Sequence, residues 1–476
     1  MTLFTTKTLQ KTLTPQEILA GNFGLEKEGL RITKEGKLAT TPHPQIFGKK
    51  LENPYITTDF SESQVEIVTP TYDTIDKAYY NISFLVDIVN TNIPDDEYIW
   101  NNSLPCILPP PEEIPIAKYD KTNKAGKQAE EYRKKLSKKY GTKKQLISGI
   151  HYNFSFKEET IEKLYKNTTH NYTYREFKDQ LYLKITRNYL RYRWLIIYLT
   201  GCSVGAHKTF TKQCLSLLEK EDGNDGYYST KGPSFRNGTS GYKNIEHLYP
   251  RYDTVKNFLD DVNRFIDNGK LSEAKELYTQ IRLKPKDKNN MIQSLRDDGI
   301  LYIEIRTVDI NSFDKCGISK KDMQFLHLFI IYLLIKEETE YDKWQEEGVY
   351  NEEKIAEQGY NPHTVLLKNG QETNLKEWGQ EIVNEMKEMN KELNLQKEEL
   401  INMAEVKIND FSKTHGKELV NIIQNKGFIN SQISIAKNNK ETSIDMIDEE
   451  YIRNNKNLKE TYVKALPGRF KYISSQ

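Results

Sequence analysis

Two glutamates lie two residues apart near the start of the chain, in the segment Phe23–Ile32, which reads FGLEKEGLRI. The alternation of residue types favours a β-strand here, and residues i and i+2 of a strand point to the same face. Glu26 and Glu28 would then hold two carboxylates side by side, which costs free energy unless a positive group lies between them. The segment therefore indicates a site for a cation.

Three further segments share this design, with one face apolar and the other charged: Ile56–Pro70, Gln145–Phe156 and Gly299–Ile310. Their polar faces and one adjoining turn carry Asp59, Glu66, His151, Glu304 and Arg306. The polar face of a one-sided antiparallel sheet is commonly just solvated, and each strand taken singly fits that interpretation. Four faces that carry mainly carboxylates, with one His and one Arg, instead indicate hard divalent cations such as Mg²⁺.

Carboxylate-bound Mg²⁺ serves several kinds of enzyme that handle phosphoryl groups, among them nucleases, phosphatases and ATP-dependent ligases. The chain has no G-x-x-x-x-G-K-[ST] loop, which excludes a P-loop nucleotide site. Its 69 basic and 68 acidic residues leave a net charge of +1 and form no basic stripe, which disfavours a nuclease. The residues alone leave the choice open.

The elements that must position these side chains are strands in the first two-thirds of the chain and helices around and after them. Helical patterns cover Lys127–Tyr140, Tyr174–Thr200 and Thr254–Ile281, and from Lys321 onward almost everything is helical. Because strands and helices do not alternate as βαβ units do, we predict an α+β fold with an antiparallel sheet and helices packed on one side. The Gly-, Ser- and Asn-rich segment Glu221–Tyr242 is predicted to be a long loop, either functional or disordered.

Three features of the sequence favour a cytoplasmic protein. The N-terminus lacks the apolar core of a signal peptide. The apolar runs Trp194–Leu199 and Phe325–Ile335 are too short to span a bilayer, so no membrane partner is expected. The four cysteines have no C-x-x-C spacing, which suits a reducing compartment.

Six segments follow one another in the order FGLEKEGLRI, ITTDFSESQVEIVTP, YRKKLSKKYG, ISGIHYNFSF, SFRNGTSGY and YIEIRTVDIN. In order and spacing they resemble the bacterial glutamate–cysteine ligases (γ-glutamylcysteine synthetases), from about Gly21 to Asn311. The resemblance implies a fold similar to glutamine synthetase: a curved, mainly antiparallel sheet forming a funnel, helices packed behind it and a helical C-terminal third. We predict one catalytic domain over residues 1–476, with a sheet-bearing core at 15–311 and a mainly helical part at 321–476 packed on it.

The reaction of that family is the first step of glutathione biosynthesis. ATP phosphorylates the γ-carboxylate of L-glutamate, and the amine of L-cysteine attacks the resulting γ-glutamyl phosphate. The resemblance implies an ADP-forming ligase that uses ATP, with Mg²⁺ or alternatively Mn²⁺. Because the charge is balanced and no basic stripe is present, no nucleic-acid partner is expected. A related carboxylate–amine ligase with a different acceptor amine is the alternative, and a metal-dependent phosphoesterase or a binding protein on an inactive ligase fold is less favoured. Because the sequence ends at Gln476, without room for the ATP-grasp module of some relatives, the dipeptide is the expected product.

The resemblance also implies roles for individual residues. Six would be ligands of Mg²⁺: Glu26, Glu28, Asp59, Glu66, His151 and Glu304. Arg306 would bind the nucleotide and stabilise charge on the transferring phosphoryl group, and Arg236 would grip a substrate carboxylate during catalysis. The acceptor pocket for cysteine would be formed by Tyr132, Leu136, Ile147 and Tyr242. Two departures concern acceptor recognition: GCSVG at 201–205, where the family often has G-A-S-P, and Gly238, where it commonly has serine.

The clustering of carboxylates on one sheet face also predicts how a substitution there changes the stability of the protein. Like charges on one sheet face repel each other, so Glu304→Gln is expected to preserve the fold or even stabilise it. Its turnover is expected to fall by orders of magnitude, because a neutral amide binds Mg²⁺ far less well than a carboxylate.

Overall fold

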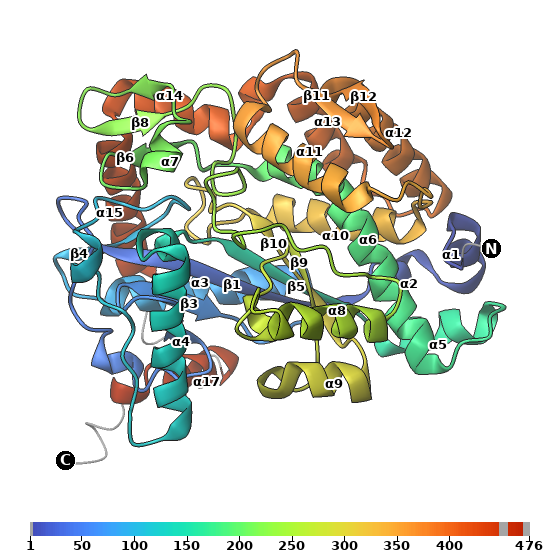
Figure 1. Cartoon of the computed structure of the whole chain (residues 1–476), viewed down its shortest axis with the longest axis horizontal. Coiled ribbons are helices and arrows are strands. Elements are labelled where there is room, and N and C mark those ends of the chain that lie inside the picture. The colour runs from blue at the N-terminus through green and yellow to red at the C-terminus, as the bar shows by residue number, and fades with distance from the viewer. Residues whose placement is uncertain (1–2, 447–455, 470–476) are drawn as a thin grey trace.

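The computed structural model describes residues 3–446 and 456–469, and a seven-stranded sheet forms its centre (Figure 1). The strand order is β2-β3-β1-β5-β10-β9, with β4 also paired to β1. The pairings between these strands are antiparallel. The strands are β1 (Gly21–Thr33), β2 (Ile56–Thr58), β3 (Gln64–Val68), β4 (Glu97–Trp100), β5 (Ile150–Phe156), β9 (Ile281–Lys284) and β10 (Tyr302–Val308).

Helices and two small sheets surround this central sheet. The small sheets are a hairpin of β11 (Val365–Lys368) with β12 (Gln371–Asn374), and a trio of β6 (Gly205–His207), β8 (Gly226–Tyr228) and β7 (Lys220–Glu221). The helices are α1 (Thr6–Thr12), α2 (Pro15–Ile18), α3 (Ile75–Asn92), α4 (Lys124–Tyr140), α5 (Glu158–Asn167), α6 (Tyr174–Thr200), α7 (Lys212–Leu215), α8 (Val255–Asp267), α9 (Met291–Asp298), α10 (Lys320–Ile335), α11 (Trp344–Gln358), α12 (Leu375–Glu392), α13 (Glu398–Asn409), α14 (His415–Lys426), α15 (Phe428–Met446) and α17 (Lys456–Ala465). In the described part of the chain, no helix combines the length and the apolar character needed to cross a membrane.

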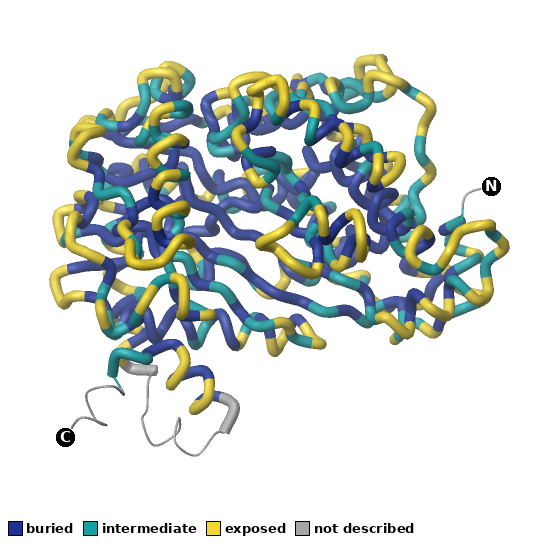
Figure 2. Tube along the Cα trace, turned by 60° about the horizontal axis from the view of Figure 1, so that its bottom comes forward, coloured by how far each residue is buried: buried dark blue, intermediate teal, exposed yellow. Residues whose placement is uncertain are grey.

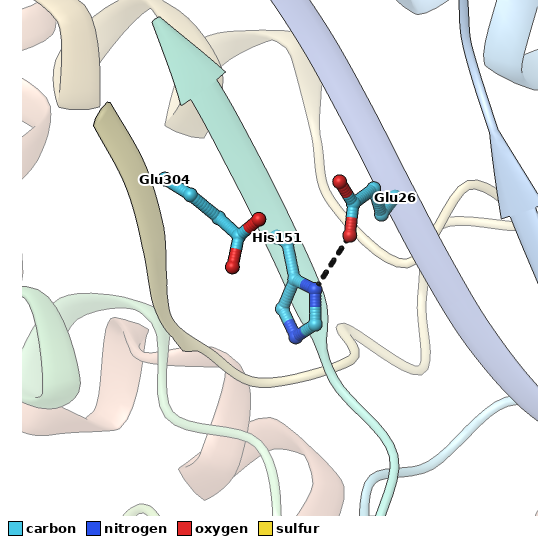
Figure 3. Close-up of side chains that lie close together, drawn as sticks. All are labelled: Glu26, His151 and Glu304. Atoms are coloured by element: carbon cyan, nitrogen blue, oxygen red, sulfur yellow. Dashed lines mark hydrogen bonds and ion pairs between the residues drawn. The ribbon is translucent and has the colours of Figure 1, made fainter. Parts of the chain in front are cut away.

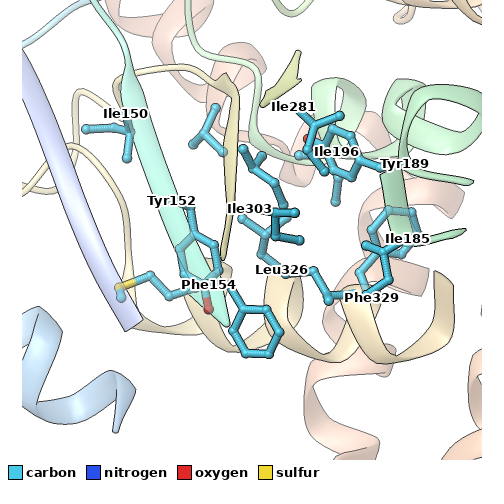
Figure 4. Close-up of a cluster of buried hydrophobic side chains, with 14 of the residues drawn as sticks. Ile150, Tyr152, Phe154, Ile185, Tyr189, Ile196, Ile281, Ile303, Leu326 and Phe329 are labelled. Carbon is cyan, nitrogen blue, oxygen red and sulfur yellow. The ribbon is translucent and has the colours of Figure 1, made fainter. Parts of the chain in front are cut away.

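One face of the central sheet is covered by helices. Apolar side chains of β5 and β10, among them Tyr152, Phe154 and Ile303, pack against α6 and α10 (Figure 4). These three side chains are 0–1% exposed, and burying Phe154 and Ile303 contributes about 1.5–3 kcal/mol each to stability. In Figure 2 the buried segments gather in the interior of the molecule and the exposed segments lie mainly at its periphery. The covered face leaves the opposite face of the sheet free to carry polar side chains.

The two helices that cover the sheet begin at clear sequence signals. Thr173 and Glu176 form a reciprocal capping box at the start of α6, and Ser319 caps α10 through the backbone N–H of Asp322. Such caps satisfy N–H groups that have no partner inside the helix, typically worth about 1 kcal/mol. The bounds of α6 agree with the predicted helix Tyr174–Thr200.

The predicted α+β class is confirmed, but several predicted boundaries are wrong. The segment Ile56–Pro70 forms two strands joined by a turn at Asp59, and the strand of Gln145–Phe156 starts only at Ile150. The predicted helix Thr254–Ile281 ends at Asp267, since Gly269 has a φ of +71° that suits glycine and stops the helix. The predicted loop Glu221–Tyr242 contains β8 and the end of β7, and the hairpin β11–β12 interrupts the helical C-terminal part. The division of the chain into a core and a helical part of one domain stays a prediction.

A buried histidine beneath the sheet predicts acid sensitivity. His327 of α10 packs edge-on against Phe23 and at a tilt against Phe154, with ring centroids 5.0 and 5.1 Å away. Burial, and then the charge of Lys397, lower the pKa of His327 to about 3. A histidine with a lowered pKa in the folded state favours unfolding as the pH falls below about 6.5. By pH 5 this one group removes about 2 kcal/mol of stability.

We therefore expect His327→Phe to lose less stability than the wild type between pH 7.5 and pH 5. Urea titrations at the two pH values measure the difference. Equal losses in both proteins would contradict the assignment of this acid sensitivity to His327.

Candidate active site

The twelve residues predicted for the site all line one cavity of about 430 Å³ on the polar face of the central sheet. Strands β1, β3, β5 and β10 supply the acidic side chains, His151 and Arg306, and the turn after β2 supplies Asp59. Helix α4 supplies Tyr132 and Leu136, and the segment after β8 supplies Arg236 and Tyr242. The fold therefore brings together side chains that the sequence separates widely.

Cross-strand register places the acidic side chains beside one another. Glu26 of β1 is directly opposite His151 of β5, and Glu28 is directly opposite Glu66 of β3. Side chains opposite each other in an antiparallel pair lie close enough to interact. The two glutamates of the opening motif thus face different neighbours, one toward β5 and one toward β3.

Glu26, His151 and Glu304 form a compact group of potential metal ligands (Figure 3). One ligand atom from each lies within 4.8 Å of the others. His151 Nδ1 is 2.9 Å from Glu26 Oε2, and Asn153 Nδ2 donates to Glu26 Oε1 at 3.1 Å. Two carboxylates and an imidazole converging from three strands are a donor set that fits a divalent cation.

Glu304 is held by two cations of the protein. Arg306 Nη1 donates to Glu304 Oε1 at 2.7 Å, and Lys284 Nζ donates to Oε2 at 2.5 Å. Burial alone would raise the pKa of Glu304, but the charges of Lys284 and Arg306 outweigh it and hold the pKa well below its usual value. The same pairing raises the pKa of the Arg306 guanidinium, against its burial. Glu304 is therefore ionised and electrostatically compensated.

Glu66, unlike Glu304, is surrounded mainly by other carboxylates. Burial and the neighbouring carboxylates of Asp59, Glu26 and Glu28 raise its pKa well above the usual value. The pKa of Glu28 is also raised, chiefly by burial, although its Oε2 accepts the Gly149 N–H at 2.8 Å. This side of the cavity carries more negative charge than the protein itself compensates, which fits the binding of a hard cation.

Arg236 lies against the backbone beside these acids. Its Nη2 donates to the Arg306 carbonyl at 2.8 Å, and its Nη1 is 3.9 Å from Asp309 Oδ1. A Cβ at Gly149 would lie 2.1 Å from Arg236 Nη2, so only glycine leaves room for the guanidinium. The guanidinium is thus fixed at the cavity wall, where it can offer its remaining N–H groups to a carboxylate.

A group of tyrosines closes the α4 end of the cavity. The Tyr242 hydroxyl is 2.8 Å from Gln145 Oε1 and 2.6 Å from the Tyr278 hydroxyl. Lys275 Nζ lies 3.8 Å from the centre of the Tyr132 ring. Leu136 and Ile147 are both buried and line the same cavity. Tyrosine hydroxyls and apolar walls together suit a small amphipathic ligand.

The sequence interpretation missed several residues that line this cavity: Gln145, Tyr278, Arg282, Lys284 and Glu352. Three of them, Tyr278, Arg282 and Lys284, belong to β9 or the segment just before it. The predicted helix Thr254–Ile281 covered Tyr278, and no element was predicted for Arg282 and Lys284. The signal was present, because Ile281 and Leu283 alternate with Arg282 and Lys284, but four residues are too few to decide between helix and strand.

These features define an α+β enzyme fold whose cavity is built from carboxylates and arginines of an antiparallel sheet. Comparison with known proteins identifies the family. Residues 6–355 match the family model for glutamate–cysteine ligase, and the chain belongs to this family.

Curated relatives and solved structures agree with this assignment. The chain is 42% identical over 424 residues to the glutathione biosynthesis bifunctional protein of Clostridium perfringens, covering 88% of this chain and 54% of that protein. It is 35% identical over 402 residues to a glutamate–cysteine ligase of Clostridium acetobutylicum, covering 77% of this chain and 83% of that protein. The crystal structure of a Francisella tularensis glutamate–cysteine ligase in complex with AMP superposes with a TM-score of 0.85 at 27% identity, covering 96% of this chain and 95% of that one. The chain spans about half the length of the bifunctional relatives that it matches.

Proposed function

We propose that the chain ligates the γ-carboxylate of L-glutamate to the amine of L-cysteine, with ATP as co-substrate, as a step of glutathione biosynthesis in the cytoplasm. The observation that carries the proposal is the convergence of six metal-ligand candidates and two arginines in one cavity of a chain that belongs to this family. A carboxylate is a poor electrophile, and its phosphorylation to γ-glutamyl phosphate supplies a leaving group. The AMP bound by the Francisella tularensis relative supports a nucleotide as ligand.

The acidic residues of the cavity would hold Mg²⁺, or Mn²⁺ as the alternative ion. Glu26, His151 and Glu304 would form one site, and Glu28, Asp59 and Glu66 would hold the remaining metal. The bound ion supplies positive charge that neutralises the nucleotide phosphates.

The other side chains would orient the reactants and stabilise charge. Arg306 lies beside Glu304 and would stabilise the phosphoryl group during its transfer. Arg236 would bind a substrate carboxylate through its guanidinium fork. Tyr132, Leu136, Ile147 and Tyr242 would hold the acceptor and exclude water, which would otherwise hydrolyse the acyl phosphate.

The decisive experiment identifies the product by mass spectrometry. Purified protein is incubated with ATP, L-glutamate, Mg²⁺ and one amine from a panel that includes L-cysteine and 2-aminobutyrate. We expect γ-glutamylcysteine as the preferred product, with ADP release that requires glutamate, amine and Mg²⁺ together.

Two results would redirect the assignment. A strong preference for another amine would identify a carboxylate–amine ligase with a different acceptor. The departure at Gly238 is a reason to test other amines. A Cβ there would lie 2.8 Å from Glu357 Oε1, so the serine common in the family would not fit at this position without a shift. ADP release that does not require an amine would instead identify a kinase-like or ATP-hydrolysing enzyme, and cleavage of a generic phosphoester would identify a phosphoesterase.

Arg236→Lys is expected to raise the KM for one of the two amino acids about tenfold or more, with a smaller change in kcat. Lysine keeps the charge but loses the planar fork that binds both oxygens of a carboxylate. Steady-state kinetics with each amino acid varied in turn measure the effect. An unchanged KM for both amino acids would remove Arg236 from substrate binding.

A further inference from the structure

Both oxygens of the Glu304 carboxylate are occupied by cations of the protein itself. Arg306 takes Oε1 and Lys284 takes Oε2, and the Glu304 side chain is only 1% exposed. Glu304 is also one of the three residues whose ligand atoms converge within 4.8 Å. A divalent cation bound by Glu304 would lie close to both of these protein cations, and like charges at such short range repel each other, so metal binding favours the withdrawal of one of the two.

The contacts of the two cations indicate which one withdraws. Arg306 follows Glu304 by two residues on the same strand, and its Nη1 also lies 3.4 Å from His151 Nδ1. Lys284 comes from the edge strand β9, is opposite Tyr302 in register, and has the Tyr302 ring 5.9 Å from its Nζ. A lysine is a point charge on a flexible stem, so it can leave one oxygen without disturbing the sheet, whereas the planar guanidinium of Arg306 is positioned by both Glu304 and His151.

We propose that Lys284 is a resident counter-ion of Glu304 that a divalent cation displaces, and that the released ammonium group then contacts the phosphates of the nucleotide. The second half of this exchange rests on the proposed function, and the first half does not. Lys284 lines the same cavity as the six candidate ligands, so a nucleotide held there by the metal would lie within reach of its ammonium group. Lysine is a common ligand for phosphate, which it binds as a point charge.

In this exchange Lys284 weakens metal binding and strengthens nucleotide binding. Removing its charge is therefore expected to change the two affinities in opposite directions. Without nucleotide, Lys284→Met leaves Glu304 Oε2 free and removes a like charge beside the metal. We expect it to bind Mn²⁺ about tenfold more tightly than the wild type does, measured by electron paramagnetic resonance titration of the nucleotide-free protein. Lys284→Arg keeps the charge at this position and is expected to remain near the wild-type affinity.

A matched control comes from a second lysine of the same cavity. Lys275 contacts the Tyr132 ring and forms an ion pair with Glu273, whereas Lys284 is paired with Glu304. Lys275→Met removes the same charge from the same cavity and is expected to change Mn²⁺ affinity less than twofold. If Lys284 only holds β9 to β10, Lys284→Met lowers Mn²⁺ affinity together with the melting temperature, and that result overturns the proposal.

The nucleotide half is tested at saturating Mn²⁺ with a non-hydrolysable ATP analogue and with adenosine. Lys284→Met is expected to weaken binding of the analogue about tenfold or more and to leave adenosine binding unchanged, because adenosine has no phosphates. Equal analogue affinity in the variant and the wild type would overturn the phosphate contact. Neither titration needs turnover, so a protein that exchanges Lys284 for Mn²⁺ but forms no γ-glutamyl product would refute only the proposed function.

Discussion

Glu66→Gln is expected to make the metal-free protein more stable and nearly inactive at the same time. Glu66 lies beside three other carboxylates, and burial with those charges raises its pKa well above the usual value. Replacing it by a neutral amide of similar shape relieves this repulsion, which is worth about 1–3 kcal/mol at pH 7.5. The same change removes a candidate Mg²⁺ ligand, so turnover is expected to fall by about 10²–10³-fold or more.

The pH dependence of the stability gain follows from the direction of the pKa shift. A carboxyl whose pKa is raised in the folded state binds its proton more tightly there than in the unfolded chain. Its contribution favours the folded state below the unfolded pKa, near 4.5, and is lost as the pH rises through the folded pKa. The gain from Glu66→Gln is therefore largest near neutral pH and falls toward zero near pH 4.

Chemical denaturation in EDTA at pH 4 and pH 7.5 measures this gain, and initial rates with Mg²⁺ measure the loss of turnover. Glu131→Gln is a matched control, because Glu131 is exposed on α4 and lies outside the cavity lining. It is expected to stay within about 0.5 kcal/mol of the wild type. A Glu66→Gln protein less stable than the wild type at pH 7.5 would show that the acids of this cavity do not repel one another.

Glu304→Gln is expected to lose turnover to a similar extent but to lose stability as well. Glu304 is buried, donates no proton and accepts hydrogen bonds from Arg306 and Lys284, and its pKa is held well below the usual value. Removing one partner of a buried ion pair leaves the other charge uncompensated, and we expect a loss of about 2–4 kcal/mol at pH 7.5. This reverses the sequence-based expectation of a preserved or stabilised fold, because the nearest charges to Glu304 are cations of the protein and not other carboxylates.

Chemical denaturation in EDTA tests whether Glu304→Gln lowers the free energy of unfolding. Glu66→Gln in the same cavity is expected to raise it. Lys284→Met in the Glu304→Gln background is expected to recover part of the loss, because the lysine is then no longer buried against a neutral amide. A Glu304→Gln protein as stable as the wild type would contradict the ion pairs described for Glu304.

The sequence by itself determined the class of the fold and the members of the candidate metal site. Period-two alternation in four segments placed Glu26, Glu66, His151 and Glu304 on one polar sheet face, and this periodicity is a local property that a single segment reveals. The ordered motifs indicated the family to which the chain belongs. Short or irregular elements such as β9 were missed, since four residues carry too little pattern.

Only the tertiary structure decided which charge stands next to which. The register of β1 against β5 and β3 sets Glu26 against His151 and Glu28 against Glu66, and no local pattern encodes the register of strands distant in sequence. The edge strand β9 brings Lys284 to Glu304, which turns an expected repulsion into an ion pair. Electrostatic energy depends on distances of a few ångströms and on burial, so the sign of each carboxylate's contribution follows from packing and not from residue type.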